Sequence, residues 1–121
     1  MTNTPNYAAL HIPPPQRYVI NHIYNKLYTN PLVSAIFLFG SCADGTANNE
    51  SDVDIFVVTN RSIHDYRDEA FDSIYGVTDD IPLDKYVCCD ILSASVEDFQ
   101  LNTTPLIRTI KNEGVMLGGI L

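Results

Sequence analysis

Residues 39–58 read FGSCADGTANNESDVDIFVV, and this stretch decides the fold. It joins two apolar runs, LVSAIFLF at 32–39 and DVDIFVVT at 52–59, through a segment of small and polar residues. Short, nearly continuous apolar runs bounded by glycine or turn residues are typical of strands buried on both faces. We therefore expect two strands here, connected by a loop or a short helical turn over residues 42–51.

Helical patterns flank these two strands. Pro13-Pro14-Pro15 can open a helix, which continues with apolar residues at helical spacing and ends at Asn30-Pro31. A second helix is expected over 62–75, with Ser62 as its N-cap and Gly76 at its end.

The last third of the chain predicts one more strand and two short helices. Residues 86–92 (YVCCDIL) form the expected third strand, Ser95 opens a short helix, and Pro105 begins another that closes at Gly114. A brief strand or tail follows at 115–117. The resulting order of helix, strand, strand, helix, strand, helix and helix indicates an α/β or α+β fold.

The chain has the size and composition of one domain. Its 121 residues are 45% hydrophobic, so we expect one domain over 1–121 with a loose lead-in at 1–12. Three cysteines, an odd number, do not make a disulfide framework. The N-terminus lacks the pattern of a signal peptide, and no apolar run is long enough to span a bilayer. We therefore expect a cytoplasmic protein that does not associate with membranes.

The charge of the chain restricts its partners. Fifteen acidic residues against seven basic ones give a formal charge of −8, which argues against a broad nucleic-acid surface. An anionic substrate would need a metal ion or a local positive site.

Two carboxylates at the start of the second strand carry the clearest chemical signal. Side chains alternate along a strand, so Asp52 and Asp54 project from one face and Val53 from the other. Two adjacent carboxylates repel each other unless a cation lies between them, and Mg²⁺ commonly takes one or two carboxylates together with substrate phosphates. The alternative is a solvated pair at the start of a strand.

The end of the first strand suits a phosphate. Gly40 permits a close approach of the backbone to a ligand, and Ser41 adds a hydroxyl and an N–H. Taken alone, this pair could equally be an ordinary turn after a strand.

Asp90 lies within the third expected strand and is the candidate for a third carboxylate. Three carboxylates can hold two metal ions about 4 Å apart, one activating a hydroxyl and one bridging the triphosphate and the leaving pyrophosphate. Asp90 would serve as a ligand and as a general base. Asp84 or Glu50 could supply this acid instead, and Asp90 could simply point into solvent from an edge strand.

Gly40-Ser41, ten residues, then Asp52-Val53-Asp54 resembles the signature of the DNA polymerase β-like nucleotidyltransferase superfamily. Asp90 and the tail IRTIKNEGVML at 107–117 are also similar to small members, the minimal nucleotidyltransferase (MNT) domains. The resemblance covers most of the chain.

The resemblance implies a small mixed β-sheet flanked by helices, the nucleotidyltransferase fold. It also implies Mg²⁺-dependent transfer of a nucleotidyl group, such as AMP from ATP, to a hydroxyl. It assigns Asp52, Asp54 and Asp90 to the metal ions and Gly40 and Ser41 to the triphosphate. Small members are often antitoxins that adenylylate a tyrosine on a HEPN-domain toxin, and others work with a separate acceptor-binding subunit.

One residue departs from this pattern, because Asp44 stands where such proteins commonly carry an arginine. An anion at this position disfavours a triphosphate, which leaves a weakly active or inactive binding subunit as an alternative. Transfer to a small molecule such as an aminoglycoside is another alternative, and it would require a homo-oligomer to build an acceptor cleft. The sequence does not select the nucleotide, the acceptor or the oligomeric state.

Overall fold

The two apolar runs form the centre of a four-stranded sheet in the computed structural model, which describes residues 10–62 and 69–119. The strands are β1 (Val33–Phe39), β2 (Val53–Thr59), β3 (Cys89–Ser95) and β4 (Val115–Gly119). Their order is β3-β2-β1-β4, with β1 antiparallel to both β2 and β4 and with β2 parallel to β3. The mixed sheet predicted from the sequence is therefore confirmed.

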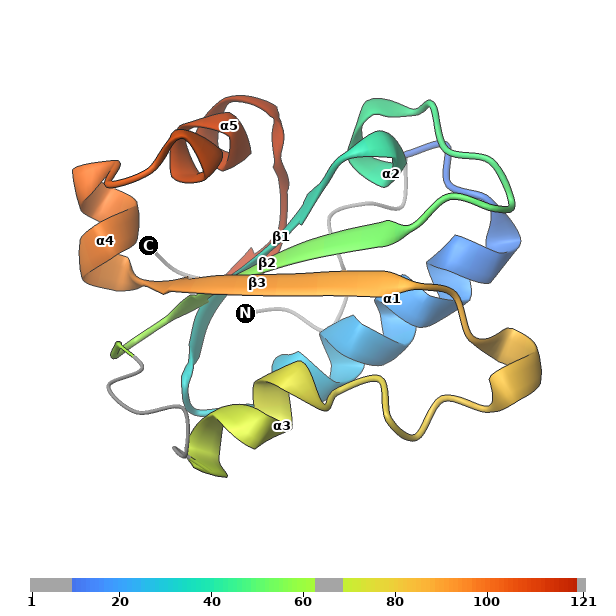
Figure 1. Cartoon of the computed structure of the whole chain (residues 1–121), viewed down its shortest axis with the longest axis horizontal. Helices are drawn as coiled ribbons and strands as arrows, with labels where there is room; N and C mark the ends of the chain where they lie inside the picture. The colour runs from blue at the N-terminus through green and yellow to red at the C-terminus, as the bar shows by residue number, and fades with distance from the viewer. Residues whose placement is uncertain (1–9, 63–68, 120–121) are drawn as a thin grey trace.

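Helices cover both faces of this sheet, which Figure 1 shows nearly edge-on. They are α1 (Pro14–Leu27), α2 (Ser41–Asp44), α3 (Asp72–Tyr75), α4 (Val96–Leu101) and α5 (Pro105–Glu113). Helices α1 and α3 lie on one side, and α4 and α5 lie on the other. The alternation of side chains along β2 explains this arrangement, since Ile55 packs in the cluster of α1 and α3 and Phe56 in the cluster of α4 and α5.

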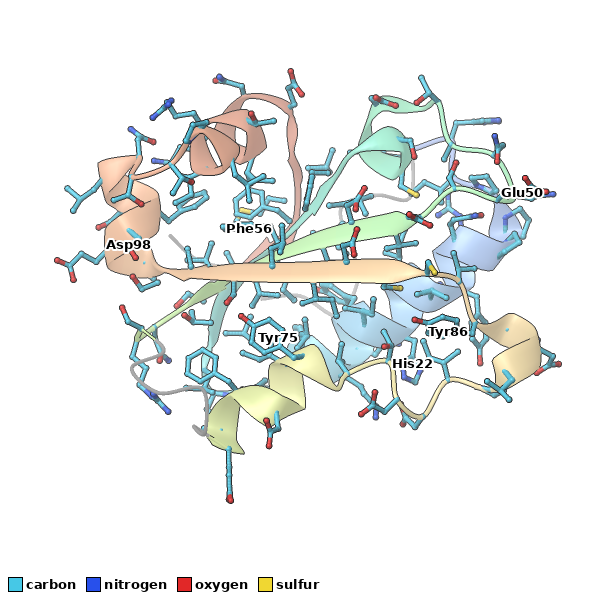
Figure 2. The ribbon with its side chains drawn as sticks, viewed as in Figure 1. His22, Glu50, Phe56, Tyr75, Tyr86 and Asp98 are labelled. Atoms are coloured by element: carbon cyan, nitrogen blue, oxygen red, sulfur yellow. The ribbon has the colours of Figure 1, made fainter. Side chains whose placement is uncertain are left out.

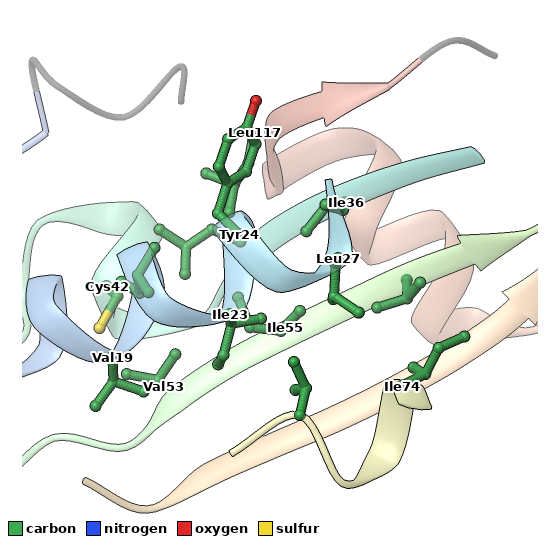
Figure 3. Close-up of a cluster of buried hydrophobic side chains, with 14 of the residues drawn as sticks. Val19, Ile23, Tyr24, Leu27, Ile36, Cys42, Val53, Ile55, Ile74 and Leu117 are labelled. Carbon is green, nitrogen blue, oxygen red and sulfur yellow. The ribbon is translucent and has the colours of Figure 1, made fainter. Parts of the chain in front are cut away.

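Helix α1 anchors the larger of the two apolar clusters. It begins next to three prolines, and its residues Val19, Ile23 and Leu27 are fully buried one helical turn apart. Figure 3 shows Val19 beside Val53 and Ile23 beside Ile55 on the sheet. Burial of each such side chain stabilises the fold by about 1.5–3 kcal/mol.

The third strand lies further along the chain than the sequence predicted. It begins at Cys89 and ends at Ser95, whereas residues 86–88 precede it and follow a 3₁₀ turn at Leu83–Lys85. Pairing sets this start, because the Val53 N–H donates to the Cys88 carbonyl at 2.9 Å and the parallel ladder runs on from there. Ser95 opens α4 as predicted, with its Oγ accepting from the Asp98 N–H.

Three other predicted segments differ in part from the structure. Within the predicted helix at 62–75, a 3₁₀ turn at Glu69–Phe71 and then α3 form, while 63–68 lie outside the described residues. The lead-in was wrong in part, because Ile12 is 7% exposed and packs in the core; residues 1–9 are not described. The brief strand or tail expected at 115–117 is a strand, β4, which pairs with β1.

Within the described ranges, no helix combines the length and the apolar character needed to cross a bilayer.

Candidate active site

The parallel pairing of β2 and β3 brings two of the predicted carboxylates together. Asp54 and Asp90 are direct partners in the register, so their side chains leave the sheet on the same face. Asp52 lies two residues before Asp54, just ahead of β2. This is the face that α4 and α5 cover farther along the strands, where Phe56 packs against Phe99 (Figure 2). The three carboxylates thus lie at the start of β2 and β3, outside the apolar cluster that Phe56 forms with α4 and α5.

Electrostatic repulsion is concentrated on Asp54. Its side chain is half-buried, whereas Asp52 and Asp90 are exposed. Burial is the main cause that raises the pKa of Asp54, and the neighbouring charges of Asp90 and Asp52 raise it further. A carboxylate in this position is stabilised by a cation, which would offset both effects.

Gly40 brings the end of β1 directly against Asp54. The two residues are adjacent across the sheet, since Phe39 pairs with Asp54. Gly40 has φ +70°, and a Cβ on it would overlap the Asp54 Oδ2 atom. Glycine is therefore required here both by backbone conformation and by space.

Ser41 continues this turn as the first residue of α2 and is half-buried. The N–H groups of Ala43 and Asp44 already donate to the Gly40 carbonyl, so the start of the turn at Ser41 is where a backbone donor can meet an anion. The Gly40-Ser41 turn predicted for phosphate binding therefore adjoins Asp54.

Asp44, the residue that departs from the expected arginine, takes part in a local turn. It ends α2, and its Oδ1 atom accepts hydrogen bonds from the N–H of Thr46 at 2.9 Å and from the Thr46 hydroxyl. The hydroxyl bond and then the backbone bond lower the pKa of this exposed carboxyl. Asp44 therefore keeps a negative charge near the predicted triphosphate turn.

The two alternative third acids are placed differently. Asp84 belongs to the 3₁₀ turn before β3 and lines a hollow of about 350 Å³ with Tyr18 and Tyr86. Glu50 is exposed on the loop between α2 and β2 (Figure 2). Neither contributes to the raised pKa of Asp54, so Asp90 is the acid that the fold brings beside it.

Two thiols close to the carboxylates were not singled out from the sequence. Burial, followed by the charges of Asp54 and Asp44, raises the pKa of Cys42 to about 11. Burial, followed by Cys88 and the carboxylates, raises the pKa of Cys89 to about 12. Both thiols therefore stay protonated at neutral pH and are poor nucleophiles and metal ligands. Cys89 directly precedes Asp90 in the sequence, whereas the proximity of Cys42 depends on how α2 packs against the start of β2.

The donor set fits a metal ion that arrives with its own ligands. Hard carboxylate oxygens suit Mg²⁺, and the repulsion at Asp54 favours a cation. In the described part of the chain, no three His, Cys, Asp or Glu side chains are placed to hold a metal by themselves. Phosphate oxygens and water would have to complete the shell, as is usual for Mg²⁺.

Comparison with solved structures shows a similar fold in two mutants of one toxin-antitoxin pair. A mutant of the toxin-antitoxin pair MntA-HpeT superposes with a TM-score of 0.52 and 17% identity, over 87% of this chain and 73% of that chain. A second mutant of this pair gives 0.50 and 19%, over 87% and 72%. A toxin-antitoxin structure with AMP-PNP gives 0.48 and 21%, over 87% and 73%.

Comparison at the sequence level identifies the family. No curated protein matches the chain. The family model described as polymerase beta, nucleotidyltransferase, matches residues 21–118, a range that includes both central strands, the three carboxylates and the Gly40-Ser41 turn. The chain therefore belongs to the polymerase β nucleotidyltransferase family.

Proposed function

We propose that this protein transfers a nucleotidyl group, AMP from ATP, to a hydroxyl on a partner protein. The observation that carries the proposal is the placement of Asp54 beside Asp90, with Asp52 on the same face and Gly40 against the Asp54 carboxylate. Membership of the nucleotidyltransferase family supports the reaction class.

Each residue of the site has a proposed role. Asp52, Asp54 and Asp90 are the ligands for Mg²⁺, and the Gly40-Ser41 turn receives the triphosphate. Two magnesium ions, when bound, would supply positive charge to the phosphates and to the attacking oxygen. The acceptor oxygen bonds to the α-phosphorus, the bond to the bridging oxygen breaks, and pyrophosphate leaves. Asp90, which is exposed, takes the proton of the acceptor hydroxyl.

A separate protein is the proposed acceptor because two hollows that the described residues form lie away from the carboxylates. The hollows of about 350 and 750 Å³ are lined partly by α1, which covers the other face of the sheet, and neither includes Asp52, Asp54 or Asp90. The fold shared with the toxin-antitoxin pair MntA-HpeT supports the proposal that this chain is an antitoxin. A HEPN-type toxin is the proposed partner. We propose that this pair acts in the cytoplasm.

Transfer of label from ATP tests the proposal. Purified protein is incubated with Mg²⁺ and α-labelled ATP in an extract of the source cells, beside Asp52→Asn and Asp54→Asn variants. We expect a labelled protein band with the wild type alone, and no such band with γ-labelled ATP, because the β- and γ-phosphates leave as pyrophosphate. Equal labelling by both variants would contradict the assignment of the carboxylates.

A binding subunit without catalysis is the second candidate, and Asp44 is the observation that favours it. Its carboxylate stays charged at the edge of the triphosphate turn. Under this alternative, the Asp54→Asn protein would still suppress the toxicity of its partner in cells. Under the enzyme proposal, suppression is lost together with transfer.

A further inference from the structure

A buried amide from α1 contacts the backbone just before the acidic pair. Gln16 is 0% exposed, and its Nε2 atom donates to the Ser51 carbonyl at 2.9 Å. The two residues are 35 positions apart in the sequence. Gln16 thus links the helix on one face of the sheet to the loop that delivers Asp52 to the other.

A glutamine at this buried position lowers the stability of the fold. Among the described residues, the Gln16 Oε1 atom is buried without a hydrogen-bond partner. An unpaired buried acceptor destabilises a fold, whereas the neighbouring Val19 and Ile20 are apolar and equally buried. Packing alone would be better served by an apolar side chain. The Ser51 carbonyl is therefore the contact that accounts for an amide at this site.

The Ser51 carbonyl is one of three successive backbone groups next to Asp52 that make a contact outside their own loop; the others are the Asp52 carbonyl and the Val53 N–H. The Cys42 thiol lies 3.6 Å from the Asp52 carbonyl, and the Val53 N–H donates to Cys88 at 2.9 Å. Asp52 itself is exposed and precedes β2, so packing of its own side chain does not fix it. Its direction depends on the backbone on either side.

We propose that Gln16 is a positioning residue. By holding the Ser51 carbonyl from the opposite face of the sheet, it orients Asp52 for metal binding. This inference rests on the proposed metal-nucleotide site and extends it to a residue that does not touch the ligand. Groups that orient metal ligands commonly change metal affinity by 10–100-fold when they are removed. Because Gln16 acts through the backbone, we place its effect near the lower end of this range.

Binding of Mn²⁺ measures this role without reference to catalysis. Free Mn²⁺ is followed by electron paramagnetic resonance as it is titrated into protein with an α,β-methylene analogue of ATP. Gln16→Met keeps the length of the side chain and removes its donor, and Gln16→Leu serves if the first variant does not fold. We expect Mn²⁺ affinity to fall about 10-fold in either variant.

Ile20→Val is the matched control, since it alters a fully buried residue of the same helix that makes no polar contact. It should lower the melting temperature and leave Mn²⁺ affinity unchanged. Unchanged Mn²⁺ affinity in a folded Gln16 variant, with binding lost in Asp52→Asn, would overturn this inference and leave the proposed function standing. Failure of the wild type to bind Mn²⁺ with the analogue would overturn both.

Discussion

Asp54 is half-buried between two other carboxylates, and the fold is less stable because of it. Since the pKa of Asp54 is raised in the folded protein, the folded protein binds this proton more tightly than the unfolded chain does. The contribution of this group to the free energy of unfolding therefore decreases as the pH rises above about 3.9, the usual pKa of aspartate.

Replacement of Asp54 should separate stability from function. We expect Asp54→Asn to melt at a higher temperature than the wild type at pH 7 without metal, because the repulsion and the cost of burying a charge are removed. The difference should shrink as the pH is lowered toward 4. Urea unfolding of both proteins across this range measures the difference in their free energies of unfolding. If the variant gains less stability over the wild type at pH 7 than at pH 4, this prediction is contradicted.

Gly40 gives a second prediction, with Gly45 as its control. Both have positive φ, +70° and +84°, but a Cβ at Gly45 would meet nothing within 4 Å, whereas at Gly40 it would overlap Asp54. Alanine should cost about 1–2 kcal/mol at Gly45, which is left-handed helical, and about 1–3 kcal/mol at Gly40, whose ψ of −154° lies in a region adopted almost only by glycine. Only Gly40→Ala should also displace the carboxylate and reduce transfer by about 100-fold. Similar activity in the two variants would show that the contact is unimportant.

The site residues were predictable from the sequence to different degrees. Asp52 and Asp54 share one strand, so the alternation of side chains was enough to place them together. Asp90 was assigned to the same site, yet only the parallel register of β2 and β3 makes it the partner of Asp54. Gln16 and Cys42 could not be found this way, because their contacts depend on how α1 and α2 pack around the loop before β2.

At the level of elements, an ion pair links α1 to the loop that leads toward β3. Asp80 accepts from His22 at 2.8 Å and from Lys26, and Lys26 first and then His22 lower the pKa of this carboxyl to about 2. The stabilisation is complete above the unfolded pKa of about 3.9 and is lost as the pH falls through about 2.

Asp80→Asn should therefore lower the melting temperature slightly at pH 7 and by less at pH 3. The effect is small because the pair is exposed and screened by water and salt. Asp79→Asn is the control, since Asp79 makes no ion pair with the residues that the structure describes. An equal change in both variants, measured by calorimetry at both pH values, would argue against a role for the pair.

Helices and strands were predicted best where one pattern dominates. The prolines and apolar spacing of α1 and the apolar runs of β1 and β2 fixed their positions to within three residues. The third strand was displaced because YVCCDIL is apolar enough for a strand from its first residue. Its true start depends on where pairing with Val53 begins, which is a tertiary contact.

For the molecule as a whole, the charge of −8 predicts that the proposed binding of a nucleotide depends on metal. The three carboxylates of the site repel a triphosphate, so we expect the ATP analogue not to bind when EDTA removes divalent ions. Binding should return when Mg²⁺ is added in excess. Titration calorimetry under both conditions checks this, and metal-independent binding of equal strength would place the nucleotide away from the carboxylates.

The most direct test of the account is a crystal structure with Mn²⁺ and the α,β-methylene analogue of ATP, with Mn²⁺ located by anomalous scattering. We expect Mn²⁺ in contact with the carboxylates of Asp52 and Asp54, with Asp90 at the same site and the phosphates against Gly40 and Ser41. A bound nucleotide whose metal lies away from these carboxylates would contradict the central claim.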